Sequence, residues 1–108
     1  ANGDHLGTTP LMGAVETAQA IEAARVAFDS WKKTSAKQRA EILRRWFDLM
    51  IENQDDLALI MTLEQGKPLA ESRGEILYAA SFIEWFAEEG KRVYGDVIPA
   101  TTPDKRIM

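Results

Sequence analysis

The sequence predicts a mainly α-helical chain with about four helices and short extended ends. Between residues 14 and 95, apolar residues recur at the three- and four-residue spacing of one helix face. Residues that start and stop helices separate these periodic segments. The two ends hold Gly, Thr and Pro, which interrupt regular structure. We therefore expect an extended arm or edge strand over 1–13, a helical segment over 14–95 and an extended tail over 96–108.

The arm and the first two helices are predicted from local signals. An edge strand is possible only around Leu6–Met12, because Gly and Pro limit anything longer. A first helix is expected over about Glu16–Lys33, with Ile21, Ala24, Phe28 and Trp31 along one stripe. Ser35 followed by Gln38 is a capping box, which predicts that a second helix begins there and runs to about Asn53.

The third and fourth helices are separated by a glycine and a proline. Asp55 or Asp56 is the expected N-cap of a short third helix. Gly66 is expected to end it in the left-handed conformation, and Pro68 then favours the first turn of a new helix. This fourth helix is expected to be the longest, weakened at Gly90 and ended at Gly95.

Composition limits the classes of function. A chain of 108 residues forms one small domain, and its net charge of −4 disfavours a nucleic-acid-binding face. No apolar run approaches the ~20 residues that cross a bilayer. There is no cysteine, so the chain has no disulfide and no thiolate nucleophile. These features predict a cytoplasmic protein without a membrane partner.

The two termini suggest a piece of a longer protein. The chain starts without a methionine and finishes on Asp104–Met108, a pattern typical of a strand that is just beginning. We therefore expect the gene to continue beyond Met108.

Few residues carry chemistry. His5 has only Asp4 beside it, whereas a metal site needs three or four ligands. Ser30 and Lys33 match the Ser-x-x-Lys pattern of penicillin-recognising enzymes, but the companion motifs are missing. Gly66-Lys67 lacks the remaining residues of a phosphate-binding loop. We expect no metal site and no phosphate loop.

Two pairs of neighbouring carboxylates, Asp55/Asp56 and Glu88/Glu89, could suggest acid–base catalysis. Adjacent helical residues point about 100° apart, so neither pair converges on one substrate. A helix cap and a solvated face explain them better.

An aromatic group on the fourth helix is the most suggestive feature. Tyr78, Phe82 and Phe86 fall on one helix face, and Trp85 lies beside it. Core packing is the commoner origin of such a stripe, and the wall of an apolar channel or ligand pocket is the functional alternative.

Several stretches carry a family resemblance. The helix break Glu64-Gln65-Gly66-Lys67-Pro68 resembles one in the aldehyde dehydrogenase superfamily, in which Gly closes one helix and Pro opens the next. Four further stretches also resemble this family, namely residues 42–46, 53–58, 79–89 and 94–99. Within it, the chain is most similar to bacterial succinate-semialdehyde dehydrogenases. The resemblance makes Glu64, Gly66, Lys67 and Pro68 structural residues of this motif.

The resemblance implies a reaction that the chain cannot perform alone. The family fold is α/β, and its members oxidise an aldehyde through a cysteine thiohemiacetal and a thioester, with NAD or NADP as hydride acceptor. This chain has no cysteine, so it is expected to hold no catalytic, cofactor-binding or metal-binding residue and to be inactive by itself.

The resemblance also implies two surfaces. Tyr78, with Phe82 one turn further on, would border the tunnel through which a succinic semialdehyde or similar small aldehyde enters. Residues Arg106–Met108 would begin a strand at the interface of a homodimer or homotetramer.

Two other hypotheses remain open. The chain could be a self-standing helical interaction module that binds a protein through its acidic faces or aromatic stripe. It could also be a shortened, inactive paralogue that acts as an assembly or regulatory subunit.

Overall fold

The computed structural model describes residues 2–95 and 101–104, and it contains four helices in that part of the chain. They are α1 (Ala14–Trp31), α2 (Ala36–Glu52), α3 (Gln54–Gln65) and α4 (Leu69–Glu89). The described residues form no strand, so the possible edge strand over Leu6–Met12 is absent and the arm is extended. The expected strand at Arg106–Met108 lies outside the described residues.

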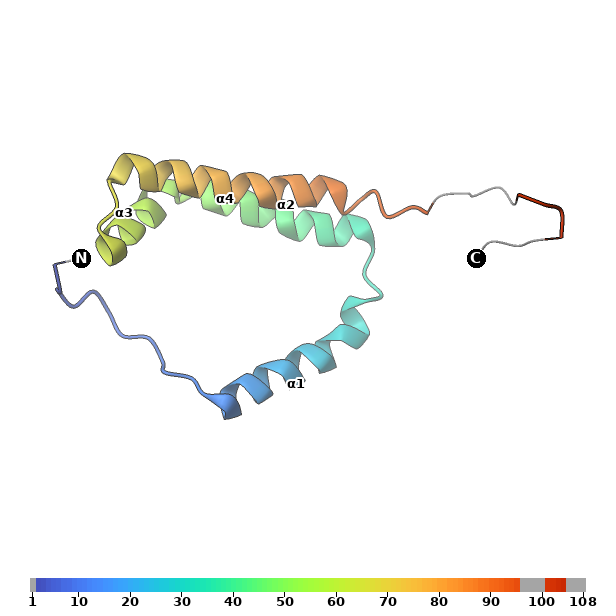
Figure 1. Ribbon diagram of the computed structural model, residues 1–108, viewed down its shortest axis with the longest axis horizontal. Coiled ribbons are helices and arrows are strands. Elements are labelled where there is room, and N and C mark those ends of the chain that lie inside the picture. The colour runs from blue at the N-terminus through green and yellow to red at the C-terminus, as the bar shows by residue number, and fades with distance from the viewer. Residues whose placement is uncertain (1, 96–100, 105–108) are drawn as a thin grey trace.

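The helices α2, α3 and α4 form the packed part of the molecule. The long helices α2 and α4 run side by side, and α3 packs against the beginning of α4 (Figure 1). Helix α1 contacts none of the other three helices and buries none of its residues. Figure 1 shows α1 lying apart from the packed helices and joined to α2 by a short corner.

The packed helices approach one another through small side chains. Ile76 is the only large side chain among the buried residues that the structure describes. The others are Ala40, Ala58, Ser72, Ala80 and Ala87. Leu43, Phe47 and Met50 of α2 add a half-buried flank to this core.

Helix boundaries follow their caps, and three expectations need correction. Helix α1 begins at Ala14 because the amide of Gly13 donates to Glu16 Oε2 at 2.9 Å. The N-cap of α3 is Asn53, so Asp55 and Asp56 lie in its first turn rather than capping it. Helix α4 ends at Glu89 with Gly90 as its C-cap, before the expected stop at Gly95.

The other cap expectations are confirmed. Ser35 and Gln38 form the reciprocal capping box of α2, with the Gln38 amide donating to Ser35 Oγ at 3.2 Å. Gly66 ends α3 in the left-handed conformation with φ +78°. Pro68 is the N-cap of α4.

The molecule is far from compact. Its radius of gyration is 21.1 Å, whereas a compact chain of this length has about 13 Å. Its accessible surface is 9225 Å², against about 6,000 Å² for a compact monomer of its mass. The aromatic side chains of Trp31, Trp46 and Phe86 are about half exposed, while Phe47 is only partly covered. Each helix therefore leaves apolar surface uncovered.

Candidate functional site: the aromatic face of the longest helix

Helix α4 is apolar on two opposite faces. One face carries the buried residues Ser72, Ile76, Ala80 and Ala87 and packs on α2 and α3. The other carries Tyr78, Phe82, Trp85 and Phe86, which are between 48% and 66% exposed. We call these four residues the aromatic face. A helix that is apolar all round is normally covered on every side, so the aromatic face is a candidate binding surface.

The aromatic face does not form the core of the described structure. Core packing was the commoner interpretation of its spacing, but the four side chains are 48% to 66% exposed within the part of the chain that the structure describes. Periodicity showed that α4 carries these apolar residues on one side. The small residues of the opposite side make the actual contacts with α2 and α3.

Tyr78 and Phe82, the two predicted tunnel residues, are in direct contact through their rings. One helical turn apart, their rings contact edge to face, with centroids 4.9 Å apart and planes at 84°. This geometry favours the rings electrostatically and limits their rotation. The two side chains thus make a continuous apolar wall with one polar atom, the Tyr78 hydroxyl.

A groove of about 740 Å³ continues the wall towards the end of α4. Phe82, Trp85 and Phe86 provide its apolar lining, and Glu84, Glu88, Glu89 and Arg92 lie at its polar rim with Ser81. This groove is lined by α4 and Arg92 alone and is open to solvent, so a second surface would be needed to enclose a ligand.

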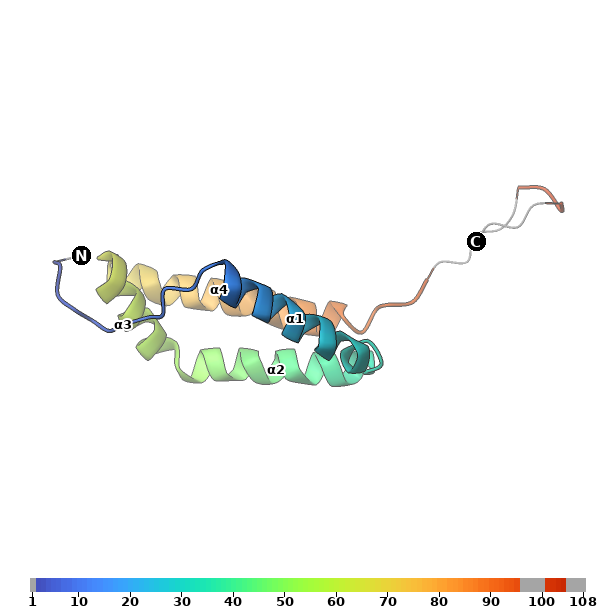
Figure 2. The same ribbon diagram turned by 90° about the horizontal axis from the view of Figure 1, so that it is seen from below.

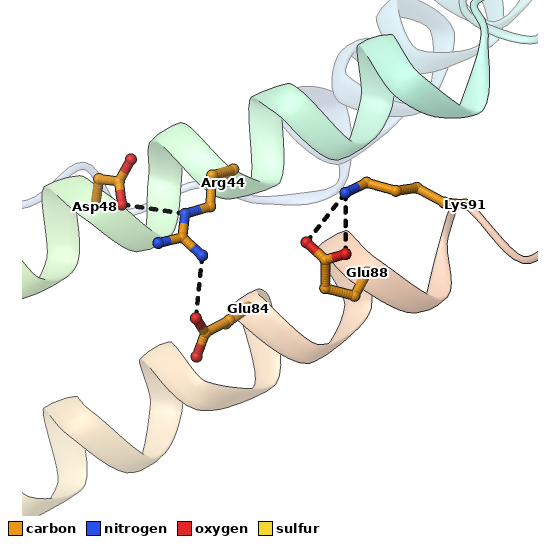
Figure 3. Close-up of polar contacts among 5 residues, drawn as sticks. All are labelled: Arg44, Asp48, Glu84, Glu88 and Lys91. Atoms are coloured by element: carbon orange, nitrogen blue, oxygen red, sulfur yellow. Dashed lines mark hydrogen bonds and ion pairs between the residues drawn. The ribbon is translucent and has the colours of Figure 1, made fainter.

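The charged groups at the rim are already paired. Glu84 accepts from Arg44 of α2 at 3.0 Å, and Arg44 also approaches Asp48 at 3.4 Å (Figure 3). Glu88 pairs with Lys91, and Arg92 pairs with Glu89. Glu88 and Glu89 thus take separate cations, which agrees with a solvated rim rather than a converging acid–base pair.

The helix-break motif forms a bonded elbow between α3 and α4. Lys67 makes an ion pair with Glu75 in the second turn of α4. Beside it, the hydroxyls of Thr62 and the fully buried Ser72 share a hydrogen bond of 2.9 Å. Glu64 lines a hollow between the arm and α3. The elbow therefore sets the direction of α4 and with it the position of the aromatic face.

Sequence patterns missed the side chains that join the helices. Arg44 and Glu84 are forty residues apart in the chain, and Thr62 and Ser72 are ten apart. Arg73 similarly reaches Asp55 across the α3–α4 contact at 2.7 Å. No local spacing signals such pairs, because they depend on how the helices are packed.

The described residues provide a surface but no reaction centre. Across residues 2–95 and 101–104, no three His, Cys, Asp or Glu side chains come together in a group that could hold a metal. His5 lies in the arm, beside α3. None of the helices described is long and apolar enough to span a membrane. The pKa values that shift, those of Glu16, Glu22, Arg25 and Asp104, belong to fully exposed groups away from the aromatic face.

The described residues also do not fit a dinucleotide cofactor. Such a site uses a glycine-rich turn between a strand and a helix, where backbone amides face the phosphates. This part of the chain has no strand, and the α3–α4 elbow has Gly66 but no other glycine of that pattern.

Comparison with known proteins identifies the family. The family model described as the aldehyde dehydrogenase family matches residues 1–108. The chain is 67% identical over 108 residues to succinate-semialdehyde dehydrogenase [NADP(+)] GabD of Escherichia coli. It is 66% identical to glutarate-semialdehyde dehydrogenase of Pseudomonas aeruginosa. In both cases the match covers the whole chain but only 22% of the relative. The chain belongs to the aldehyde dehydrogenase family.

Solved structures agree with this family. The crystal structure of an E. coli NADP-dependent enzyme matches 96% of the chain with a TM-score of 0.91 and 67% identity. That match spans 22% of the longer chain. An aldehyde dehydrogenase from Brucella melitensis biovar abortus matches 95% of the chain with a TM-score of 0.90 and 61% identity. The helical arrangement described above is therefore the one adopted within much longer chains.

Proposed function

We propose that this chain is the N-terminal helical part of an NAD(P)-dependent aldehyde dehydrogenase that oxidises succinic semialdehyde or a similar small aldehyde to the acid. The observation that carries the proposal is the uncovered aromatic face of α4, in a chain that matches about a fifth of its relatives. A helix with two apolar faces needs a second partner, and the remainder of a dehydrogenase would supply it.

In this proposal the reaction centre lies outside the 108 residues. The chain has no cysteine to attack the aldehyde carbon, so the thiohemiacetal and thioester would form on a residue elsewhere in the protein. The cofactor site would also lie elsewhere, because the described residues do not fit a dinucleotide. The chain alone is therefore expected to be inactive.

The role proposed for Tyr78 and Phe82 is to line the path of the substrate. Their edge-to-face contact gives a fixed apolar wall, which suits the short carbon chain of a semialdehyde. The groove rim beside them carries three carboxylates, and its one arginine, Arg92, pairs with Glu89. A cation that recognises the acid group of the substrate would therefore come from another part of the protein.

The names of two relatives support the proposed class of substrate, a small semialdehyde. Relatives of nearly equal identity are named for succinate semialdehyde and for glutarate semialdehyde, which differ by one methylene group. A pocket discriminates one methylene by only about 1–3 kcal/mol, so both substrates belong in the test.

The test compares the whole protein with the 108-residue chain. Each is assayed with succinic and glutaric semialdehyde, using NAD⁺ and NADP⁺ separately. We expect turnover only with the whole protein. Turnover by the 108-residue chain, or no aldehyde oxidation by the whole protein, would contradict the proposal.

Replacing Tyr78 with Ala in the whole protein tests the tunnel wall. We expect a higher KM for the semialdehyde and an unchanged KM for the dinucleotide, because only the aldehyde would pass the aromatic face. Leu77→Ala is the matched control, since Leu77 is also about half exposed but points to another side of α4. Equal effects of the two substitutions on the semialdehyde KM would remove Tyr78 from the substrate path.

A further inference from the structure

Helix α1 is held in place by its ends rather than by packing. It buries no residue and contacts no other helix, although Ile21, Phe28 and Trp31 leave apolar surface on it. Its N-terminal end continues into the extended arm, whose residues 2–13 are all exposed. Figure 2 shows the other end turning directly into α2. The direction of α1 relative to α2 therefore depends on the corner between them, residues 32–35, and on the arm, which lies beside α3 at its other end.

The corner is a network of hydrogen bonds. The Thr34 amide donates to the carbonyl of Trp31 at 3.0 Å, and the Thr34 hydroxyl donates to the same carbonyl at 2.7 Å. On the other side, the Ser35 amide donates to Gln38 Oε1 at 2.9 Å. These bonds fix the end of α1 and the start of α2 separately.

Arg39 is the side chain that joins the two halves of the corner. From the first turn of α2 its Nη1 reaches back to the carbonyl oxygen of Thr34 at 2.6 Å and approaches the Thr34 hydroxyl at 3.4 Å. Arg39 is half-buried, and its contact is among the few part-buried side-chain hydrogen bonds described. A charged donor in such a place makes a stronger bond than a neutral one.

Arg39 is also linked to the end of α1 through Thr34. The last turn of α1 contains no basic residue, and the C-cap residue Lys32 makes an ion pair with Asp29 at 2.6 Å. The guanidinium of Arg39 binds the Thr34 carbonyl, three residues beyond the end of α1. Because Thr34 is itself bonded to the carbonyl of Trp31, this one side chain links the end of α1 to α2.

We propose that Arg39 is a positioning residue that sets the angle between α1 and α2 and so holds α1 apart from the packed helices. A second observation supports this: the E. coli crystal structure reproduces the same arrangement over 96% of the chain, although that protein is several times longer. The direction of α1 relative to α2 is therefore shared with that longer protein. Presetting the angle lowers the entropy lost when another part of a protein packs between α1 and α2.

The test measures the distance between α1 and α4 in the 108-residue chain. The chain has no cysteine, so Gln19→Cys and Glu71→Cys give the only two sites for spin labels. Both positions are exposed. Double electron–electron resonance is expected to show one narrow distance distribution, and Arg39→Ala is expected to abolish that single peak. Arg39→Lys, which keeps a charged donor, is expected to restore part of it.

Two controls keep the result interpretable. Arg45→Ala removes an exposed arginine from the outer side of the same helix and should leave the distribution unchanged. If Arg39→Ala lowers the helix content measured by circular dichroism, Arg39→Met replaces it, because methionine keeps a long aliphatic side chain but cannot donate to the carbonyl oxygen of Thr34.

A narrow, unchanged distribution in both Arg39→Ala and Arg39→Met would overturn the proposal, as would a broad distribution in the unmodified corner. The readout is a distance and not a rate, so the result stands apart from the dehydrogenase assay.

Discussion

At the scale of single residues, two helix starts use the same geometry with different chemistry. Glu16 accepts a hydrogen bond from the Gly13 amide at the start of α1, and Gln38 accepts one from the Ser35 amide at the start of α2. The first acceptor is a carboxylate and the second is an uncharged amide. The bond to Gly13 lowers the pKa of Glu16, so the protonation state of this carboxylate is linked to the start of α1.

Acid is therefore expected to loosen the start of α1 and not the start of α2. Because the pKa of Glu16 is lower in the folded chain, its stabilising effect is complete above the usual glutamate range and is lost as the pH falls through the lowered pKa. An NMR titration would show the Gly13 amide shifting in acid while the Ser35 amide stays constant. Glu16→Gln should remove the titration of Gly13, and its persistence would exclude Glu16 as the cause.

At the scale of helices, glycine has opposite effects at two places. Gly66 has a positive φ of 78° at the α3–α4 elbow, where side chains rarely fit. Gly74 lies inside α4, and a methyl group added there would meet no atom within 4 Å. The first glycine is required by the backbone, whereas the second weakens a helix without giving contact in return.

The substitutions Gly66→Ala and Gly74→Ala should therefore change stability in opposite directions. Gly66→Ala is expected to cost about 1–2 kcal/mol, from the strain of a left-handed alanine. Gly74→Ala is expected to add about 1 kcal/mol, the difference in helix propensity. Urea unfolding followed by circular dichroism measures both in the same chain. A loss of stability on Gly74→Ala would mean that the outer side of α4 at Gly74 is covered by a close contact.

The helices themselves could be predicted from the sequence, because their signals are local. The Ser35–Gln38 box and the Gly66–Pro68 break lie within a few residues of the ends they define, and both ends were found. Asp55 was wrongly taken as a possible cap because its type suits that position, whereas the structure uses its carboxylate to bind Arg73.

The role of the aromatic residues could not be predicted from the sequence. Periodicity places Tyr78, Phe82 and Phe86 on one face of α4, but it does not say what covers that face. The core instead uses Ser72, Ala80 and Ala87, which are too small to stand out in an apolar pattern. The partner of an apolar face is a property of the tertiary structure, so pattern alone does not identify it.

At the scale of the whole molecule, many large apolar side chains of the described residues are exposed. The aromatic face of α4 is one group of them, and Ile42, Trp46 and Leu49 form a second exposed stripe on α2. Helix α1 adds a third, with Phe28 and Trp31. The accessible surface exceeds that of a compact monomer by about 3,000 Å². An excess of this size is comparable to the area buried in a permanent interface between proteins.

The 108-residue chain is accordingly expected to bind a hydrophobic dye such as 8-anilinonaphthalene-1-sulfonate under native conditions. Replacing Trp85 with Gln should weaken the fluorescence signal, because Trp85 is 64% exposed on the aromatic face. Lys37→Gln on the polar side of α2 is the control and should leave the signal unchanged. Dye binding no greater than that of a compact protein of equal mass would show that these faces are covered in solution.

The small side chains of the core have an evolutionary consequence. Four of the six buried residues that the structure describes are alanines, at positions 40, 58, 80 and 87. Every amino-acid replacement that a single-base change in an alanine codon can produce adds atoms to the side chain, except the replacement by glycine. Larger side chains in a tight contact commonly cost about 1–3 kcal/mol. Substitutions at these positions should therefore destabilise the helices mainly because a larger side chain does not fit between them. We expect natural variants at these four positions to be restricted to glycine and serine.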